Sequence, residues 1–167
     1  STKSIYGIHD DTAAGIADRI ALDNLRDRYP GIEFKDINTS TMTRAKQARI
    51  LADLPEDSVL VYMTCYTDNE ENAYSLENVT SFIMSNTTAP VFRNYEGAMG
   101  SGIVGGTFLD FKTQGLWAAK TMASVLAGGD ISSIKLNMET PNMTEVDYGI
   151  LVKYGISEDK LPEGAIL

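Results

Sequence analysis

The chain of 167 residues carries a formal net charge of −9 at pH 7, and 43% of its residues are apolar while 22% are charged. These values are ordinary for a globular chain of one domain with a substantial core. The acidic balance argues against a nucleic-acid backbone or an anionic membrane surface as the main partner. Cys65 is the only cysteine, so no internal disulfide forms, and its apolar surroundings predict a buried, inert thiol.

The first part of the chain alternates predicted strands with predicted helices. Apolar or alternating runs predict the strands, apolar residues at helical spacing predict the helices, and turn-forming residues separate them. In chain order the segments are a strand at 4–9, a helix at 13–29, a strand at 32–37, a helix at 41–54, a strand at 58–66 and a helix at 76–84. The run 58–66 is the most apolar, which is typical of a central parallel strand buried on both faces.

The second part of the chain is punctuated by glycines. Its predicted segments are a buried strand at 90–94, a strand at 102–109, a helix at 113–126, a strand near 134–138 and a final helix at 145–154. Within the helix 113–126, the spacing of Leu116, Ala119, Ala123 and Leu126 predicts a stripe that faces the core.

Strands that alternate with helices through short connections predict an α/β fold with three α/β/α layers and a mainly parallel, Rossmann-like sheet. In such sheets ligands bind beyond the carboxyl ends of the strands. The polar and aromatic residues at those ends are therefore the candidate ligand-binding residues. They are His9, Asp10, Asp11, Asn38, Tyr66, Asp68, Tyr95 and Glu96.

Tyr66, Tyr95 and Glu96 look most like ligand contacts, because solute-binding clefts pack aromatic faces on rings and use carboxylates to fix hydroxyls and amines. The alternative is that Tyr95 covers the edge of the sheet while Glu96 is solvated. For Asp10 and Asp11 the alternative is that they cap the helix that follows. A single histidine without metal-ligand spacing does not favour a metal site, and no cofactor is expected.

Gly100, Gly102 and Gly105 match the letters of the dinucleotide-binding fingerprint. That motif requires a helix to open on its last glycine, whereas residues 107–109 here predict a strand. We therefore interpret Gly100 and Gly102 as a hinge, and expect neither nicotinamide nor flavin binding. The sequence contains no nucleophile elbow, zinc-protease motif, Walker loop or Cys-x-x-Cys pair, which favours a non-enzymatic role.

The last third of the chain contains a pattern of small residues in one helix, a helix-ending glycine and an aromatic final helix. The residues of this pattern are Gln114, Gly115, Ala118, Ala119, Leu126, Gly128, Asp147, Tyr148, Lys153, Tyr154, Gly155 and Ile156. The pattern resembles the closing segment of type 1 periplasmic-binding-protein-like domains. Within them, it is most similar to the uncharacterised ABC-transporter substrate-binding group, which also serves as the extracytoplasmic input domain of bacterial histidine kinases and diguanylate cyclases.

The resemblance covers nearly the whole chain and implies a division into two parts. Residues 1–99 resemble the second lobe of a two-lobed binding protein, and residues 100–167 resemble the hinge and the segment that returns into the first lobe. Most of the first lobe would then be missing from this chain. Apolar surface left exposed on Leu116, Trp117 and Met122 would favour a homodimer or strand exchange.

The resemblance also implies a function. The pair Tyr95 and Glu96 stands where an aromatic–acid pair, commonly Trp-Asp, follows the strand in that family. We expect a non-enzymatic domain that binds or senses a small-molecule solute, without nucleic acid as a partner. Segment 161–167 resembles the exit of membrane-tethered sensors, which favours a sensor over a transporter receptor. The expected location is extracytoplasmic, with any targeting segment or membrane tether outside this chain.

A second hypothesis is a receiver-like phosphoacceptor switch. Asp10 and Asp11 follow the first predicted strand and Asp68 follows the third, as the acids around Mg²⁺ do in receiver domains. Against it, residues 93–95 end the fourth strand without the expected Ser or Thr, and the C-terminal residues have no place in that fold. A third possibility is a structural fragment that has no ligand of its own, because half of its cleft is missing.

Overall fold

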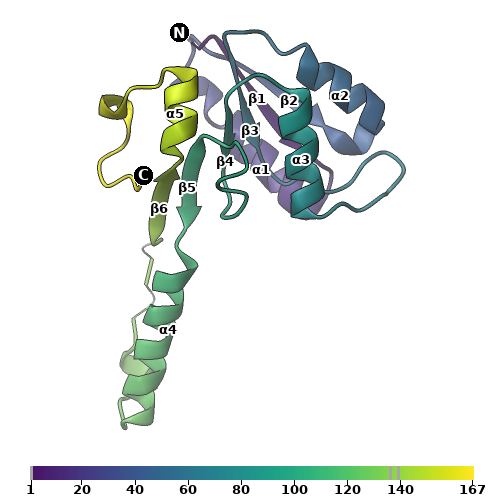
Figure 1. The fold of residues 1–167 in the computed structure, drawn as a ribbon. Coiled ribbons are helices and arrows are strands. Elements are labelled where there is room, and N and C mark those ends of the chain that lie inside the picture. Colours follow the sequence, from purple (N-terminus) through teal and green to yellow (C-terminus); the bar gives the residue numbers. More distant parts are fainter. Residues whose placement is uncertain (1, 136, 139) are drawn as a thin grey trace.

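The computed structural model describes residues 2–135, 137–138 and 140–167. Its six strands form one sheet in the order β2-β1-β3-β4-β5-β6, in which β6 runs antiparallel to β5 and the other neighbours are parallel (Figure 1). The strands are β1 (Ser4–His9), β2 (Glu33–Asn38), β3 (Ser58–Tyr62), β4 (Val91–Arg93), β5 (Gly105–Leu109) and β6 (Asn142–Val146). The predicted α/β fold with a mainly parallel sheet is confirmed.

Helices cover both faces of this sheet, which gives the predicted three layers. The helices are α1 (Ala13–Asp23), α2 (Arg44–Ala52), α3 (Leu76–Asn86), α4 (Phe111–Leu126) and α5 (Tyr148–Tyr154). Short 3-10 segments lie at Arg26–Arg28, Thr39–Thr41, Ile131–Ser133 and Glu158–Lys160. Side chains alternate between the two faces along each strand. Leu60 accordingly packs in the cluster beneath α2 and α3, whereas Val61 packs in the cluster beneath α1.

Several predicted boundaries shift for local reasons. The first helix stops at Asp23 instead of residue 29, and a separate 3-10 turn follows it. Strand β3 ends at Tyr62 instead of residue 66. The Met63 N–H still donates to the Ile8 carbonyl of β1, but the N–H of Thr64 donates to the Asp18 carboxylate of α1. Strand β5 begins at Gly105 instead of residue 102, because residues 97–102 form a loop with several positive φ angles.

The strand predicted near 134–138 is wrong for the described residues of that span, and residue 136 lies outside them. The last strand among the described residues is β6. It lies between the predicted strand near 134–138 and the predicted helix at 145–154, and it includes the first two residues of that helix. It pairs with β5 along its whole length, and the hydroxyls of Thr107 and Thr144 lie 2.8 Å apart across the pair. Of the described residues in this span and just after it, Ile134, Lys135, Asn137 and Pro141 instead line a cavity together with Trp117 of α4.

The C-terminal segment returns to the main body and packs on it. Leu151 of α5 is buried against Val104 and Val146, and Phe92 of β4 borders the same cluster. The chain then reaches the outer edge of β6, where Ile166 donates its N–H to the Thr144 carbonyl at 2.9 Å and its carbonyl accepts from the Val146 amide at 2.8 Å. The last residues therefore cover the free edge of the sheet.

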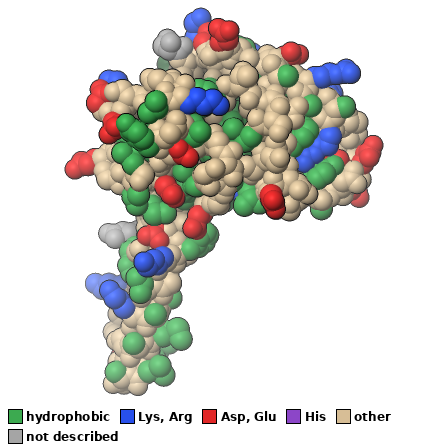
Figure 2. Space-filling model, viewed as in Figure 1, with side chains coloured by type: hydrophobic (Ala, Val, Ile, Leu, Met, Phe, Trp, Pro, Cys, Tyr) green, Lys and Arg blue, Asp and Glu red, His purple; other side chains and the backbone are tan. Residues whose placement is uncertain are grey.

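Helix α4 projects away from this body as an arm (Figure 1). Every residue of α4 is at least partly exposed, and the exposed fractions reach 51% at Leu116, 64% at Met122 and 85% at Leu126. The predicted core-facing stripe is thus wrong for this chain taken alone, since nothing among the described residues buries it. Apolar side chains are visible along the arm in Figure 2. Trp117, on the other side of the helix, is only half-exposed because it faces segment 134–141.

The junction of β4 and β5 requires a residue without a side chain. A Cβ atom at Gly106 would lie 1.8 Å from the carbonyl oxygen of Arg93, which is backbone and has no room to move. We predict that Gly106→Ala lowers the free energy of unfolding by about 2 kcal/mol or more, because overpacking forces the backbone apart. Urea denaturation followed by far-UV circular dichroism measures this loss.

Gly115→Ala is the matched control, since a Cβ at this position in α4 would meet nothing within 4 Å. It should leave the urea midpoint unchanged and raise helix content slightly, because alanine favours a helix over glycine. Equal midpoints for the two variants would contradict the steric account of the β4–β5 junction.

Candidate functional site

The carboxyl ends of β1, β3 and β4 meet at one edge of the sheet. In the strand register Ile8 pairs with Tyr62, and Tyr62 pairs with Arg93. The chain segments that follow these residues therefore emerge side by side. Strand β5 runs in the same direction and leads into α4 after one residue, so the arm also leaves the body at this edge (Figure 1).

Asp10 is fully buried and connects two of these segments. One carboxylate oxygen accepts the Thr12 N–H at 3.0 Å and the Thr12 hydroxyl, and the other accepts the Tyr66 N–H at 2.7 Å. Thr12, and not Asp11, is the N-cap of α1, since its hydroxyl accepts from Gly15. Through these hydrogen bonds, Asp10 links the start of α1 to the segment after β3.

Asp18 is a second buried carboxylate, which the sequence analysis missed. It is 8% exposed and projects from α1. Its oxygens accept the Thr64 N–H at 3.0 Å, the Asn94 amide at 3.0 Å and the Tyr95 hydroxyl at 2.9 Å. Asp18 thus joins the ends of β3 and β4 to the helix. An aspartate at an inward position of a helix that buries Gly15 and Leu22 was the available signal, because charges are rarely buried unless paired.

A row of polar side chains, which we call the polar rim, lies beyond the carboxyl ends of β1 and β2. The Asn38 amide donates to the Asp11 carboxylate at 2.7 Å, and the Asp11 N–H donates to the Ser40 hydroxyl at 3.0 Å. Ser40 lies 3.2 Å from the Thr67 hydroxyl, which carries the row to the segment after β3. The predicted residues Asp11 and Asn38 are therefore in direct contact.

Tyr66 and Arg93 lie between the ends of β3 and β4. The Arg93 guanidinium is 4% exposed and stacks on the Tyr62 ring, with 4.1 Å from Cζ to the ring centroid. One terminal nitrogen of Arg93 donates to the Tyr66 hydroxyl at 2.9 Å. The predicted residue Tyr66 is thus held at its backbone by Asp10 and at its hydroxyl by Arg93.

Tyr95 is 41% exposed and presents its ring beyond the end of β4 while Asp18 holds its hydroxyl. Partial burial, and then this bond to a carboxylate, raise the pKa of the Tyr95 hydroxyl above its ordinary value. Glu96 follows it and is exposed. The ring is oriented by its bond to Asp18 and is still open on one side.

His9 and Asp68 have different surroundings from the other predicted residues. His9 is 1% exposed; its Nδ1 lies 3.1 Å from the Asp10 carbonyl and its Nε2 lies 3.6 Å from the Asp36 carboxylate. The Asp68 carboxylate accepts from the amides of Glu70 and Asn72 and from the Tyr74 hydroxyl at 2.6 Å. Asp68 therefore organises its own loop, and the described residues contain no group of three or more His, Cys, Asp or Glu that could hold a metal ion.

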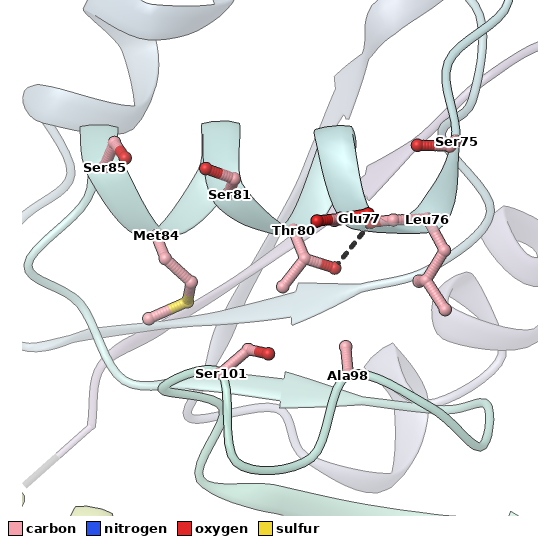
Figure 3. A pocket seen from close by; sticks show the side chains of 9 residues that line it. All are labelled: Ser75, Leu76, Glu77, Thr80, Ser81, Met84, Ser85, Ala98 and Ser101. Atoms are coloured by element: carbon pink, nitrogen blue, oxygen red, sulfur yellow. Dashed lines mark hydrogen bonds between the residues drawn. The ribbon is translucent and has the colours of Figure 1, made fainter.

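A cavity of about 630 Å³ lies apart from these residues, between α3 and the loop after β4 (Figure 3). Leu76, Thr80 and Met84 of the helix point toward Ala98 and Ser101 of the loop. None of the predicted ligand-binding residues lines this cavity. Several of the predicted residues instead lie at the strand edge described above. Asn38 bonds to Asp11, Tyr66 bonds to Asp10, and Tyr95 bonds to Asp18 of α1.

Comparison with known proteins gives matches in structure alone. No protein-family model and no curated protein matches the chain. The ABC domain in complex with L-Trp from Streptococcus pneumonia has a TM-score of 0.65 at 13% identity, over 99% of this chain and 55% of that one. The ligand-free, open structure of a substrate-binding protein with adhesive properties from Clostridium difficile has a TM-score of 0.67 at 16% identity, over 99% and 54%.

A conserved domain protein from Vibrio cholerae is also similar, with a TM-score of 0.59 at 17% identity, over 98% of this chain and 52% of that one. The chain therefore has the fold of periplasmic-binding-protein-like domains, and it spans about half the length of the solved structures that it matches. Among the described residues, no helix is long and apolar enough to cross a membrane.

The hydrogen bonds at Asp68 generate a pH prediction. The Tyr74 hydroxyl, and then the Asn72 side chain, hold the pKa of Asp68 far below its ordinary value. Ionised Asp68 therefore stabilises the fold fully above the unfolded carboxyl pKa of about 4, and this contribution is lost as the pH falls toward the lowered pKa. We predict that Asp68→Asn folds but unfolds at lower urea than the wild type at pH 7, and that the gap narrows below about pH 4.

Urea midpoints of both proteins between pH 7 and pH 3 measure this gap. Asp53→Asn, which changes an exposed carboxylate elsewhere, is the control and should track the wild type throughout. A gap that stays constant with pH would show that Asp68 contributes by shape and not by charge.

Proposed function

We propose that the chain is a non-enzymatic lobe of a solute-binding protein and that it binds a small molecule at the strand edge that carries Asp11, Asn38, Tyr66 and Tyr95. The observation that carries the proposal is the fixed geometry of this edge. Buried Asp10 and Asp18 orient the segments after β3 and β4, so that an aromatic ring, a phenol hydroxyl and the Asp11–Asn38 pair are preset before any ligand arrives. The likeness to substrate-binding proteins supports it.

The ring of Tyr95 supplies an apolar face for a ligand, and the polar rim supplies acceptors and donors for its hydroxyl or amino groups. A further role for Glu96, at the exposed start of the loop after β4, belongs to the same proposal. No nucleophile with an adjacent base enters it, which is why we propose binding and not catalysis. A phosphoacceptor role for Asp68 is less well supported, because the Tyr74 hydroxyl bonds to one of its carboxylate oxygens and the Asn72 amide bonds to the other.

We further propose that another lobe, the first lobe of a two-lobed protein, covers this edge and packs on helix α4. The apolar stripe of α4 is exposed, the arm leaves the body at the ligand-binding edge, and the similar structures are almost twice as long as this chain. In this proposal residues 1–99 form the second lobe, residues 100–167 form the hinge and the return segment, and Gly100 and Gly102 act at the hinge. Both glycines have positive φ angles, at 76° and 99°, which few other residues adopt without strain.

Closure of the two lobes around a solute would convert binding into a change of shape. A domain of this kind serves either as a transporter receptor or as the input domain of a sensor. We favour an extracytoplasmic sensor with its membrane tether outside this chain, because segment 161–167 resembles the exit of such domains. A sensor would pass on closure through the C-terminal segment, which is hydrogen-bonded to β6.

The binding proposal predicts that solute affinity depends on Tyr95. Tyr95→Ala should weaken binding by roughly tenfold or more, because it removes the aromatic face that packs on the ligand. Native mass spectrometry of the purified protein identifies a retained solute, and calorimetry then compares the variants with that solute or, if none is retained, with L-tryptophan and the other amino acids.

Tyr148→Ala is the control, since Tyr148 is 53% exposed on α5, after the antiparallel strand β6 and so at the opposite edge of the sheet. It should bind as the wild type does. Incubation with acetyl phosphate and Mg²⁺ is the opposing test: phosphate mass added at Asp68 would replace the binding proposal with the phosphoacceptor hypothesis.

The exposed stripe of α4 predicts self-association when the other lobe is absent. We expect the 167-residue chain to form a homodimer at micromolar concentration through α4. Met122→Glu should weaken this dimer by roughly 100-fold, because a charge replaces an apolar side chain on both copies. Gln114→Glu adds the same charge on the side that faces segment 134–141 and should leave the dimer intact. Native mass spectrometry distinguishes these cases, and a monomeric wild type would contradict the prediction.

A further inference from the structure

The buried guanidinium of Arg93 is incompletely paired. Its Nε atom and one terminal nitrogen are buried and have no hydrogen-bond partner in the part of the chain that the structure describes, and none of the ion pairs there involves Arg93. Its contacts are the Tyr62 ring at 4.1 Å and the Tyr66 hydroxyl at 2.9 Å. Burying a charge without an ion-pair partner is costly, so we expect this residue to lower the stability of the ligand-free protein.

The two buried carboxylates of this edge, Asp10 and Asp18, form no ion pair with Arg93 among the described residues. Both oxygens of Asp10 are occupied by Thr12 and by the Tyr66 amide. Both oxygens of Asp18 are occupied by Thr64, Asn94 and Tyr95. A buried guanidinium with two unpartnered nitrogen atoms and no ion pair in the described part of the chain points to a charge partner that comes from outside.

Tyr66 connects Arg93 to the strand edge, because its hydroxyl is bonded to the Arg93 guanidinium. Arg93 is the donor in their hydrogen bond, so the Tyr66 oxygen accepts and its own O–H is left to donate elsewhere. Tyr66 is half-buried, whereas Arg93 is buried. A hydroxyl that is left to donate, with a positive charge bonded to its oxygen, favours a negatively charged oxygen over a neutral or positively charged group.

We propose that Tyr66 and Arg93 form an anion-recognising subsite, so that the solute of the strand edge carries a carboxylate or phosphate oxygen that accepts from the Tyr66 hydroxyl. This inference rests on the proposed binding function and narrows its ligand class to small anions and zwitterions. Tyr66 touches the ligand, and Arg93 is a positioning residue that acts through it. The ligand charge offsets the buried guanidinium, which links binding directly to stability.

The first test needs no ligand. Arg93→Met replaces the buried charge with an apolar side chain of similar length that still packs on the Tyr62 ring. We expect the urea midpoint of the ligand-free protein to rise, because the uncompensated charge is removed. A fall in the midpoint would overturn the proposal, since it would mean that Arg93 is a net stabilising, structural residue. Arg44→Met is the matched control: Arg44 also stacks on aromatic rings, Tyr74 and Phe82, but is hydrogen-bonded to Gln47, and its loss should not raise the midpoint.

The second test uses sodium acetate and sodium phosphate against sodium chloride at equal ionic strength. The thermal midpoint of the wild type and of Arg44→Met should rise in at least one of the two buffers relative to chloride, and the responding anion identifies carboxylate or phosphate as the preferred group. Arg93→Met and Tyr66→Phe should lose this increment, and Arg93→Lys should restore part of it. Equal increments in all variants would overturn the subsite.

A retained or added solute separates this inference from the function on which it rests. If calorimetry shows that the solute binds with the same affinity to Arg93→Met and to the wild type, the anion subsite is wrong while the binding function stands. If the solute binds the wild type at least tenfold more tightly than Arg93→Met, the subsite is supported. L-Tryptophan and L-tryptophanamide provide a pair that differs in the carboxylate alone, and the subsite requires the acid to bind more tightly than the amide.

Discussion

The arrangement of the strand edge depends on two buried carboxylates that accept hydrogen bonds from loops. Asp10 and Asp18 together hold the backbone of Thr64 and Tyr66 and the side chains of Asn94 and Tyr95. Each of these bonds joins segments that are far apart in the sequence, since Asp18 and Tyr95 are 77 residues apart. Charged acceptors form stronger hydrogen bonds than neutral ones, and the same carboxylates would be costly if unpaired. The loops are therefore fixed by groups that tolerate little displacement.

The sequence predicted the architecture because that information is local and repetitive. The apolar run 58–66 and the alternation of strands with helices identified a parallel sheet without any knowledge of contacts. The errors fall where a local pattern met a non-local partner. Strand β3 stops at Tyr62, and the Thr64 amide two residues later donates to Asp18 of α1 instead of to a strand. Strand β6 was missed because Asn142–Val146 is a strand through its pairing with β5 and not through its composition.

For the candidate site, too, local patterns were predictable from the sequence and non-local partners were not. The rule that ligands bind at strand ends selected Asp11, Asn38, Tyr66 and Tyr95, and the structure places them at one edge because topology alone brings the strand ends together. Their binding of a ligand stays a prediction. It did not reveal Asp18, which lies in a helix, nor that Asp68 is committed to Tyr74 in its own loop. Hydrogen-bond partners across more than 40 residues have no periodic signature. The stripe on α4 was recognised as apolar, but periodicity cannot say whether its partner belongs to the same body.

The two outer edges of the sheet explain where this molecule can join another. Strand addition requires a row of unpaired backbone groups. At one edge Ile166 already bonds to Thr144 and Val146. At the other, β2 carries the charged residues Glu33, Lys35 and Asp36, and charges on an edge strand discourage pairing with a neighbouring chain. The sheet edges therefore offer little for strand addition. The assembly proposed above would rely on side-chain packing on the arm, a kind of contact that forms and breaks without disturbing the hydrogen bonds of the sheet.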